Sequence, residues 1–225
     1  MSFHDNLAAA TADARAQLFT VPVITDCLAG RVTRAQYIAF LTEAYHHVSH
    51  TVPLLMSCGA RLPADKAWLR DAVAEYIEEE RGHDQWILDD IAAAGGDVHA
   101  IRNGTPGAAT ELMVAYVYDY IARRNPVGFF GMVFVLEGTS AAIALHAADA
   151  IEQALRLPST ALRYLRSHGE IDRQHVRFFA ALVDRLDADD DRASVVHVAK
   201  MVYRLYADVF RSLPRATAAV LEVSQ

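Results

Sequence analysis

Residues 168–175 have the sequence HGEIDRQH. In an α-helix, His168, Asp172 and His175 stand at i, i+4 and i+7, which places all three side chains on one face over two successive turns. Two imidazoles and a carboxylate on one face form a ligand set that suits iron, manganese or zinc. A solvated polar face is the alternative, because a chain with ten histidines produces such spacings by coincidence. Apolar residues that follow, up to Leu182, indicate that one side of this helix is buried.

Helical periodicity extends in both directions from this stretch and predicts an all-α protein with about seven helices. No segment shows the alternation that is typical of a strand. Thr33 with Gln36 forms a capping-box pattern, Pro53 is expected to kink the helix that follows, and Gly82 to weaken the next one. The chain from Pro214 onward is expected to pack loosely. The predicted helices cover about residues 5–19, 33–56, 63–91, a segment that opens at 105–106, 125–157, 159–186 and 189–213.

Composition limits the classes of protein that this chain can belong to. The 225 residues are 53% hydrophobic and 22% charged, which predicts a single domain over residues 1–225 with a full core. A net charge of -7 and the lack of a basic block longer than Arg123-Arg124 argue against nucleic acid as a partner. The two cysteines, Cys27 and Cys58, form no disulfide or zinc pattern, which favours a reducing cytoplasm. No uninterrupted apolar run approaches the roughly 18 residues of a membrane span.

A second candidate ligand pair lies in the predicted helix over residues 63–91. Glu80 and His83 have the Glu-x-x-His spacing that helical di-iron carboxylate sites use. Glu79, at i-4 from His83, shares the face of that histidine nearly as well, so the spacing leaves open which glutamate is the ligand. The run of three glutamates at 78–80 is also compatible with an acidic, solvated helix face.

Glu137 stands alone in the most apolar segment of the chain. It follows Phe134 and Leu136 and precedes small residues such as Gly138 and Ala141. Burial of a carboxylate is costly unless a cation or strong hydrogen-bond donors meet it. A metal ion would remove that cost, and a buried arginine or backbone donor is the alternative partner.

A further group of polar residues shares one face of the helix predicted over residues 33–56. Glu43 and His46 repeat the Glu-x-x-His spacing, which allows a ferritin-like alternative with Glu43, His46, Glu80, His83 and Glu137 as ligands. That alternative leaves the triplet at 168–175 unused. We therefore expect this group to line a substrate pocket or to support the ligands from behind. The group consists of Glu43, His46, His47 and His50.

Together these motifs resemble the heme-oxygenase-like di-iron oxidases and oxygenases, whose superfamily also contains the TenA proteins and the pyrroloquinoline quinone synthase PqqC. The resemblance covers about residues 33–186 and implies a heme-oxygenase-like or TenA-like helical bundle. Other members of the family place the first glutamate about two turns before the histidine, where this chain has Tyr76. The resemblance implies two iron ions per chain, bound by Glu80, His83, Glu137, His168, Asp172 and His175.

The resemblance also implies an activity. Family members use two ferrous ions and O₂ to desaturate, cleave or oxygenate a small substrate, mostly an amino-acid or fatty-acid derivative, and we expect a biosynthetic role and a homodimer. TenA-type hydrolases use a cysteine nucleophile in mid-chain, where this sequence has none, and heme oxygenases use an axial histidine in the first helix, for which His4 is a poor candidate. A cofactor-free PqqC-like or TenA-like enzyme and a non-catalytic metal-binding helical protein remain the alternatives.

Overall fold

The computed structural model describes residues 1–215, except for the side chains of Arg173 and Gln174. Over this range the chain forms twelve α-helices, three short 3-10 helices and no strand, which confirms the predicted all-α class. The expected loose packing of the C-terminal tail concerns mostly residues 216–225, which lie outside the described range. The elements are α1 (Phe3–Ala10), α2 (Ala12–Phe19), α3 (Pro22–Leu28), α4 (Arg34–Val48), α5 (Thr51–Arg61), η1 (Ala64–Lys66), α6 (Ala67–Glu80), α7 (His83–Ala93), α8 (Val98–Arg102), α9 (Ala108–Arg123), η2 (Pro126–Phe129), α10 (Phe130–Leu155), η3 (Ser159–Ala161), α11 (Arg163–Val183) and α12 (Asp189–Ser212).

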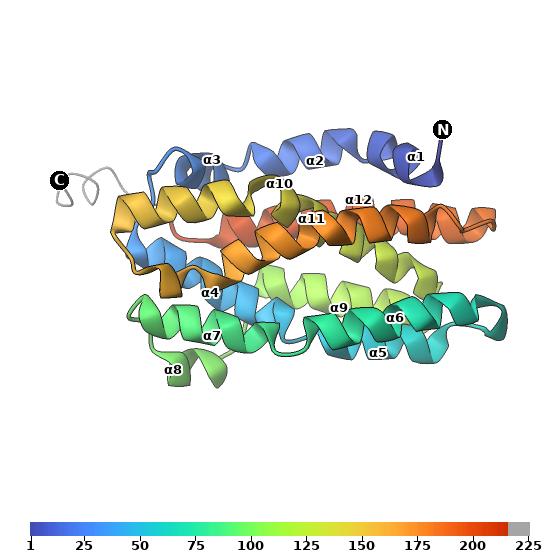
Figure 1. Ribbon diagram of the computed structural model, residues 1–225, viewed down its shortest axis with the longest axis horizontal. Helices are drawn as coiled ribbons and strands as arrows, with labels where there is room; N and C mark the ends of the chain where they lie inside the picture. The colour runs from blue at the N-terminus through green and yellow to red at the C-terminus, as the bar shows by residue number, and fades with distance from the viewer. Residues whose placement is uncertain (216–225) are drawn as a thin grey trace.

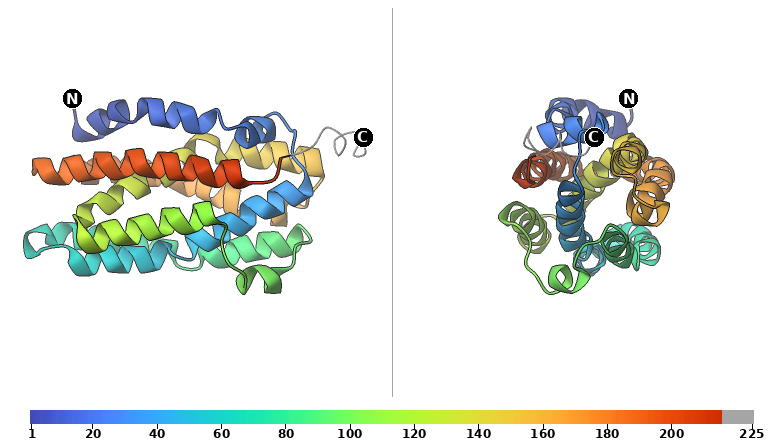
Figure 2. Two further views of the ribbon diagram at one scale, coloured as in Figure 1. Left: turned by 180° about the vertical axis from the view of Figure 1, so that it is seen from behind. Right: turned by 90° about the vertical axis from the view of Figure 1, so that its left-hand side faces the viewer.

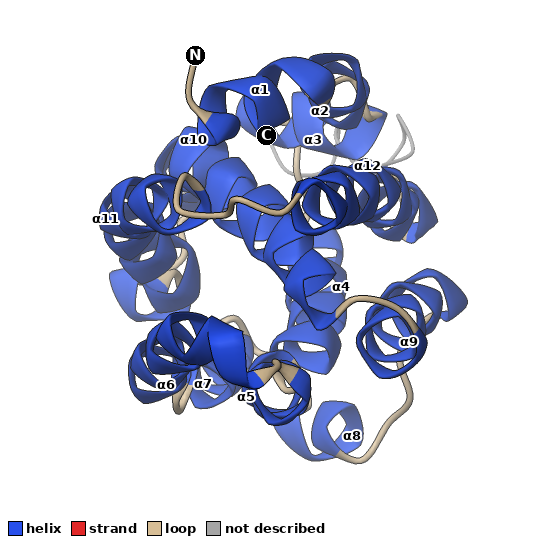
Figure 3. Cartoon of the chain, turned by 90° about the vertical axis from the view of Figure 1, so that its right-hand side faces the viewer, coloured by secondary structure: helices blue, strands red, loops and turns tan. Residues whose placement is uncertain are grey.

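The helices form an elongated bundle. Helices α1 to α3 run along one side, α10, α11 and α12 lie beside them, and α5, α6, α7 and α9 form the opposite side (Figures 1 and 2). Viewed from one end, α11 faces α6 and α7, while α12 lies on the side of α9 (Figure 3). Helix α4 packs against α7 and α9, and its buried residues share a core cluster with the second half of α10. Of the predicted ligand helices, α11 packs against both α7 and α10.

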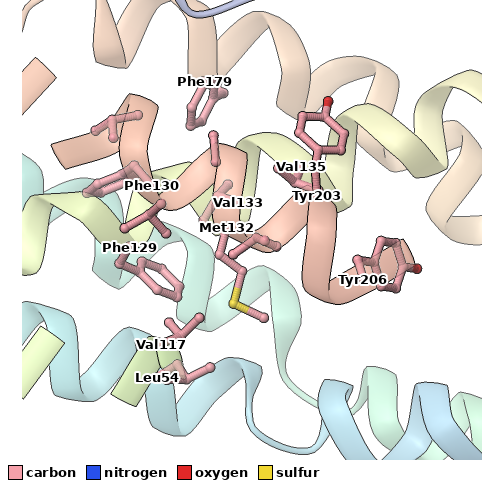
Figure 4. Packing of buried hydrophobic residues seen from close by; sticks show 14 of the residues in the cluster. Leu54, Val117, Phe129, Phe130, Met132, Val133, Val135, Phe179, Tyr203 and Tyr206 are labelled. Atoms are coloured by element: carbon pink, nitrogen blue, oxygen red, sulfur yellow. The ribbon is translucent and has the colours of Figure 1, made fainter. Parts of the chain in front are cut away.

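Helix α10 is the central element of the core. It packs extensively against α11 and α12, and its first turns bury Met132, Val133 and Val135 among residues of the surrounding helices, such as Leu54 and Phe179 (Figure 4). The helical stretch over residues 126–155 is long and apolar enough to cross a membrane, with a mean hydropathy of 1.7, yet 56% of that window is buried in the protein. This burial is typical of the core helix of a soluble protein, and the cytoplasmic location and the homodimer stay predictions.

The helix predicted over residues 33–56 begins as expected but breaks earlier. The side chain of Thr33 accepts a hydrogen bond from the backbone of Gln36, and the Gln36 side chain accepts one from Thr33, which completes the capping box. The helix ends at Val48, and α5 begins at Thr51, so the kink predicted at Pro53 is wrong. Pro53 instead lies in the first turn of α5, where the backbone N–H that proline lacks would have no partner within the helix.

Gly82 interrupts the helix predicted over residues 63–91. Helix α6 ends at Glu80, Gly82 adopts a left-handed conformation with φ +86°, and α7 begins at His83. Glycine adopts this conformation without the steric cost that a Cβ imposes. The prediction of one continuous helix is therefore wrong, and Glu80 and His83 stand on either side of a turn.

The start of α11 depends on a residue far away in the sequence. The buried carboxylate of Asp90 accepts hydrogen bonds from the backbone N–H groups of Arg163, at 3.1 Å, and Tyr164, at 2.9 Å. These N–H groups have no partner within the helix, so Asp90 acts as the cap of α11. Residue 159, where the sequence predicted this helix to begin, starts the short helix η3 instead, and α11 begins at Arg163.

Candidate metal centre

Helix α11 turns its His168-Asp172-His175 face into the bundle. Asp172 is 2% exposed and His175 is 5% exposed. His168 is half-buried, and its ring lies against the rings of His83 and Tyr164, with centroids 4.7 Å and 4.6 Å away. The structure therefore excludes the alternative in which these three residues form a solvated face.

A first cluster brings together Glu80, His83 and His168. One ligand atom from each lies within 4.8 Å of the others. Glu80 Oε2 is 3.0 Å from His83 Nδ1, and the ring of Trp86 covers His83 with centroids 4.0 Å apart. The turn at Gly82 brings the α6 carboxylate beside the first residue of α7, so the cluster is assembled from three helices.

A second cluster consists of Glu137 from α10 and Asp172 and His175 from α11, all three buried. His175 Nδ1 lies 3.3 Å from Glu137 Oε1 and 3.6 Å from Asp172 Oδ1. Glu137 Oε2 has no hydrogen-bond partner among the described residues. The six residues predicted as ligands thus form two groups of three, and α11 contributes residues to both groups.

The second cluster combines two buried carboxyl groups with one imidazole. Burial raises the pKa of the Glu137 carboxyl to about 8, although His175 acts in the opposite direction. Burial alone would lower the pKa of His175, but contacts with Asp172, Glu137 and Glu79 raise it to about 10. Burial thus disfavours the charged form of Glu137, whereas the surrounding carboxylates favour the charged form of His175. A metal cation would compensate the two carboxylates of this cluster.

The first cluster differs in its electrostatics. Burial raises the pKa of Glu80, but the neighbouring His83 and His168 outweigh this effect, so that the pKa lies below its usual value. Burial lowers the pKa of His168. A carboxylate and a neutral imidazole are the protonation states that bind metals.

Glu79 lies on the other side of His175. Its Oε2 is 2.8 Å from His175 Nε2, while His175 Nδ1 faces Glu137 and Asp172. The Glu79 side chain is 44% exposed, whereas that of Glu80 is 10% exposed. The geometry thus groups Glu80 with the candidate ligands and places Glu79 where a carboxylate orients a metal-binding histidine from behind. Tyr76 packs edge-on against the His175 ring, with centroids 5.7 Å apart, and its hydroxyl has no hydrogen-bond partner within the described part of the chain.

Most of the polar group at residues 43–50 has other roles. Both carboxylate oxygens of Glu43 accept from the backbone N–H of Gly107 at the start of α9, and one also accepts from the Thr110 hydroxyl. His50 Nδ1 is within hydrogen-bond distance of the Tyr118 hydroxyl, at 3.1 Å. Neither Glu43 nor His46 belongs to either cluster, so the described residues give the ferritin-like alternative no support. Of this group, His47 lines a cavity together with candidate ligands of both clusters.

Two cavities adjoin the clusters. The metal-side cavity, of about 90 Å³, is lined by four of the six candidate ligands, by His47, and by apolar residues of α5 and α10. The apolar cavity, of about 100 Å³, lies among α3, α4, α10, α11 and α12. Sequence reasoning missed Ser140, although its position at i+3 from Glu137 places it on the same helix face. The two cavities share the lining residues Ser140, Tyr164, His168 and Tyr206.

Residues 38–207 match the family model of an iron-containing redox enzyme. The chain belongs to this family. No curated protein matches the sequence. The match covers the four helices that carry the six candidate ligands, and it confirms the resemblance inferred from their motifs.

Solved structures show the same fold. A domain of unknown function with a heme oxygenase-like fold, from Shewanella denitrificans OS217, is 26% identical with a TM-score of 0.82, over 93% of this chain and 90% of that chain. A TenA homologue from Pseudomonas syringae pv. tomato is 10% identical with a TM-score of 0.76, over 93% and 90%. Heme oxygenase from Leptospira interrogans is 15% identical with a TM-score of 0.76, over 95% and 100%. The last two likenesses concern the fold alone.

The residues of the centre suit iron ions bound directly by side chains. Three buried ligand-type atoms, Glu137 Oε2, His168 Nδ1 and His175 Nδ1, have no hydrogen-bond partner in the part of the chain that the structure describes, and a cation would satisfy them. Three imidazoles and three carboxylates are the mixed nitrogen and oxygen set of helical di-iron proteins. His4 lies apart from both clusters, in a groove beside Phe134, and its ring lies edge-on to Phe134 and Phe179.

Proposed function

We propose that this protein is an O₂-dependent, non-heme di-iron oxidoreductase that oxidises a small organic substrate. The observation that supports the proposal most strongly is the arrangement of six ligand-type residues, four buried and two half-buried, in two groups of three, to both of which α11 contributes. Membership of the iron-containing redox enzyme family supports iron and redox chemistry. Two ferrous ions held there would supply electrons for the reduction of O₂.

The side chains of this protein define what the site can do. Glu80, His83 and His168 would hold one ion, and Glu137, Asp172 and His175 the other. Six protein ligands for two ions leave coordination positions open for O₂ and substrate. Apolar residues of α5 and α10 line the metal-side cavity and would exclude water from it once a substrate enters.

An anaerobic titration with Fe(II) tests the iron stoichiometry. Saturation is expected near two equivalents per chain, and His175→Ala should remove about one of them because one ion loses an imidazole. Saturation at zero or one equivalent in the unchanged protein would contradict the di-iron proposal and favour a cofactor-free enzyme or a structural metal.

The adjacent glutamates provide a matched pair of variants. Glu80→Ala should weaken iron binding and abolish O₂-dependent turnover. Glu79→Ala should keep two irons with a moderate loss of affinity, of about 10-fold or more, because it removes only the partner of His175 Nε2. Equal losses of iron in both variants would show that Glu79 binds the metal directly.

A further inference from the structure

The apolar cavity follows one face of α10 away from the metal centre. Ser140, Ala144, Ala147 and Ile151 line it at helical spacing, and this face continues from Glu137. From Ser140 to Ile151 the helix rises by about 16 Å. The cavity volume of about 100 Å³ compares with the roughly 10–15 Å³ that one water molecule needs. The cavity is thus large enough for a chain of several carbon atoms.

The lining of this cavity offers no counter-charge. Among the described residues that line it there is no lysine, arginine, aspartate or glutamate. Polar groups toward its outer part are already paired: the Tyr37 hydroxyl donates to Ala161 O at 2.6 Å, and Gln36 bonds to Thr33 and to Pro214 O. A charged or strongly polar group placed there would remain without a partner, which is costly in a buried site.

Unpaired polar groups are found instead at the inner end. The buried Ser140 Oγ, where the two cavities meet, has no hydrogen-bond partner among the residues that the structure describes. Across the metal-side cavity, His47 is 4% exposed, and its buried Nδ1 is also without a partner. Burial and the nearby His168 lower the pKa of His47 to about 4, so this ring is neutral at pH 7 and can both donate and accept a hydrogen bond.

We infer that the substrate is an aliphatic chain with a single oxygen-bearing head group, a carboxylate or a hydroxyl. The tail lies in the apolar cavity, and the head lies at its inner end, within reach of Ser140 and His47 and beside the metal centre. The carboxylates that line the metal-side cavity, Glu80, Glu137 and Asp172, are the proposed ligands, so no free carboxylate there would pair with an ammonium group. Molecules with a second charge are therefore disfavoured. The head's position at the reacting centre rests on the proposed function, whereas the tail site does not.

Binding of straight-chain carboxylates of increasing length, from butanoate to decanoate, tests the tail site. It is measured by calorimetry both in metal-free protein and in anaerobic Fe(II)-loaded protein. Each added methylene should lower Kd about fourfold, which corresponds to about 0.8 kcal/mol, until the cavity is filled. In the Fe(II)-loaded protein, octanoate should bind more than about 100-fold more tightly than 8-aminooctanoate, whose ammonium would be buried without a partner. The alcohol series, measured in the same way, shows which head group binds better.

Substitutions in α10 test whether the aliphatic tail lies in the apolar cavity. Ala147→Leu should shorten the longest chain that binds while leaving butanoate unaffected, and Ala144→Phe should abolish binding of all but the shortest chains. Ala142→Leu, at an exposed position of the same helix outside the apolar cavity, is the matched control. Circular dichroism and the thermal midpoint show whether each variant folds, and Ala147 is only half-buried, so its replacement is the milder change.

The outcomes separate the two proposals. A Kd that falls with chain length, and that rises again in Ala147→Leu for long chains only, supports the tail site even if the protein binds no iron. A Kd that is independent of chain length in both forms of the protein, or equal binding of octanoate and 8-aminooctanoate by the Fe(II)-loaded protein, would overturn it. Iron stoichiometry, measured separately, tests the metal centre alone.

Discussion

Glu137 is the residue at which stability and metal binding are expected to conflict. Its carboxylate is buried in the most apolar helix, and one of its oxygens has no hydrogen-bond partner in the described structure of residues 1–215. Without a metal, the folded protein must either bury a charge there or take up a proton. Glu137→Gln keeps the shape of the side chain and removes the charge, so we expect it to stabilise the metal-free protein.

The size of this effect follows from proton linkage. The pKa of Glu137 is about 8 in the folded protein, against an ordinary value of 4.5. For a group whose pKa rises on folding, stability is fully present below the unfolded pKa and is lost as the pH rises toward the folded pKa. Between pH 4.5 and pH 7 the loss is about 3 kcal/mol, at about 1.4 kcal/mol per unit. The glutamine N–H₂ group needs partners of its own, so the expected gain at pH 7 is about 1–3 kcal/mol.

Urea unfolding of chelator-treated protein at pH 7 and pH 5 measures the gain. It should shrink to below about 1 kcal/mol at pH 5, where the unfolded carboxyl is itself partly protonated. Glu75→Gln, at an exposed position of α6, is the control and should change stability by less than about 0.5 kcal/mol. Fe(II) at 100 times its Kd should then stabilise the unchanged protein by about 2.7 kcal/mol and the Glu137→Gln variant by less.

Two results would refute this reasoning. If metal-free Glu137→Gln is no more stable than the unchanged protein at pH 7, the buried carboxylate carries no electrostatic cost. If it is more stable by the same amount at pH 5 and pH 7, the gain comes from packing and not from the charge.

Three further predictions concern the elements that hold the centre. Gly82→Ala should destabilise the protein by about 1 kcal/mol in urea unfolding and weaken iron binding, because φ +86° strains any residue with a Cβ, although no atom lies within 4 Å of the added methyl group. Asp90→Ala should lower stability by about 1–3 kcal/mol, since two N–H groups at the start of α11 lose their acceptor. A stability unchanged within about 0.5 kcal/mol would show that these N–H groups find other acceptors. Fe(II) affinity should rise between pH 6 and pH 8, and Fe(II) binding should release protons, because Glu137 and His175 both have raised pKa values and must be deprotonated to bind metal. Calorimetry in buffers of different ionisation enthalpy measures the number of protons released.

The local patterns of the sequence predicted a large part of this molecule. The capping box of Thr33 and Gln36 depends on residues three apart, and it is present as expected. The i, i+4, i+7 spacing at 168–175 placed three polar residues on one face, and the apolar residues around Glu137 indicated its burial. In each case the relevant contacts are set within one or two helical turns, where the sequence contains the whole pattern.

Contacts between residues far apart in the sequence could not be predicted from such local patterns. Asp90 caps α11 from 73 residues away, and its sequence neighbourhood resembles that of any acidic residue on a helix. Gly82 was expected to weaken a helix, but whether a glycine weakens or breaks a helix depends on the packing of the flanking segments. The role of Glu79 also depends on a contact between helices, because its partner His175 belongs to α11.

The two Glu-x-x-His pairs discussed above show why the same spacing leads to a candidate metal site in one case and not in the other. Glu43 and His46 have the same spacing as Glu80 and His83, and from the sequence both are candidate ligand pairs. In the fold, both carboxylate oxygens of Glu43 accept hydrogen bonds at the start of α9. Hydrogen-bond donors therefore already compensate its charge. Glu80 instead joins His83 and His168, next to a cluster whose carboxylates exceed its cations. A spacing pattern selects a helix face, whereas the unpaired buried atoms on that face identify the residues that need a metal.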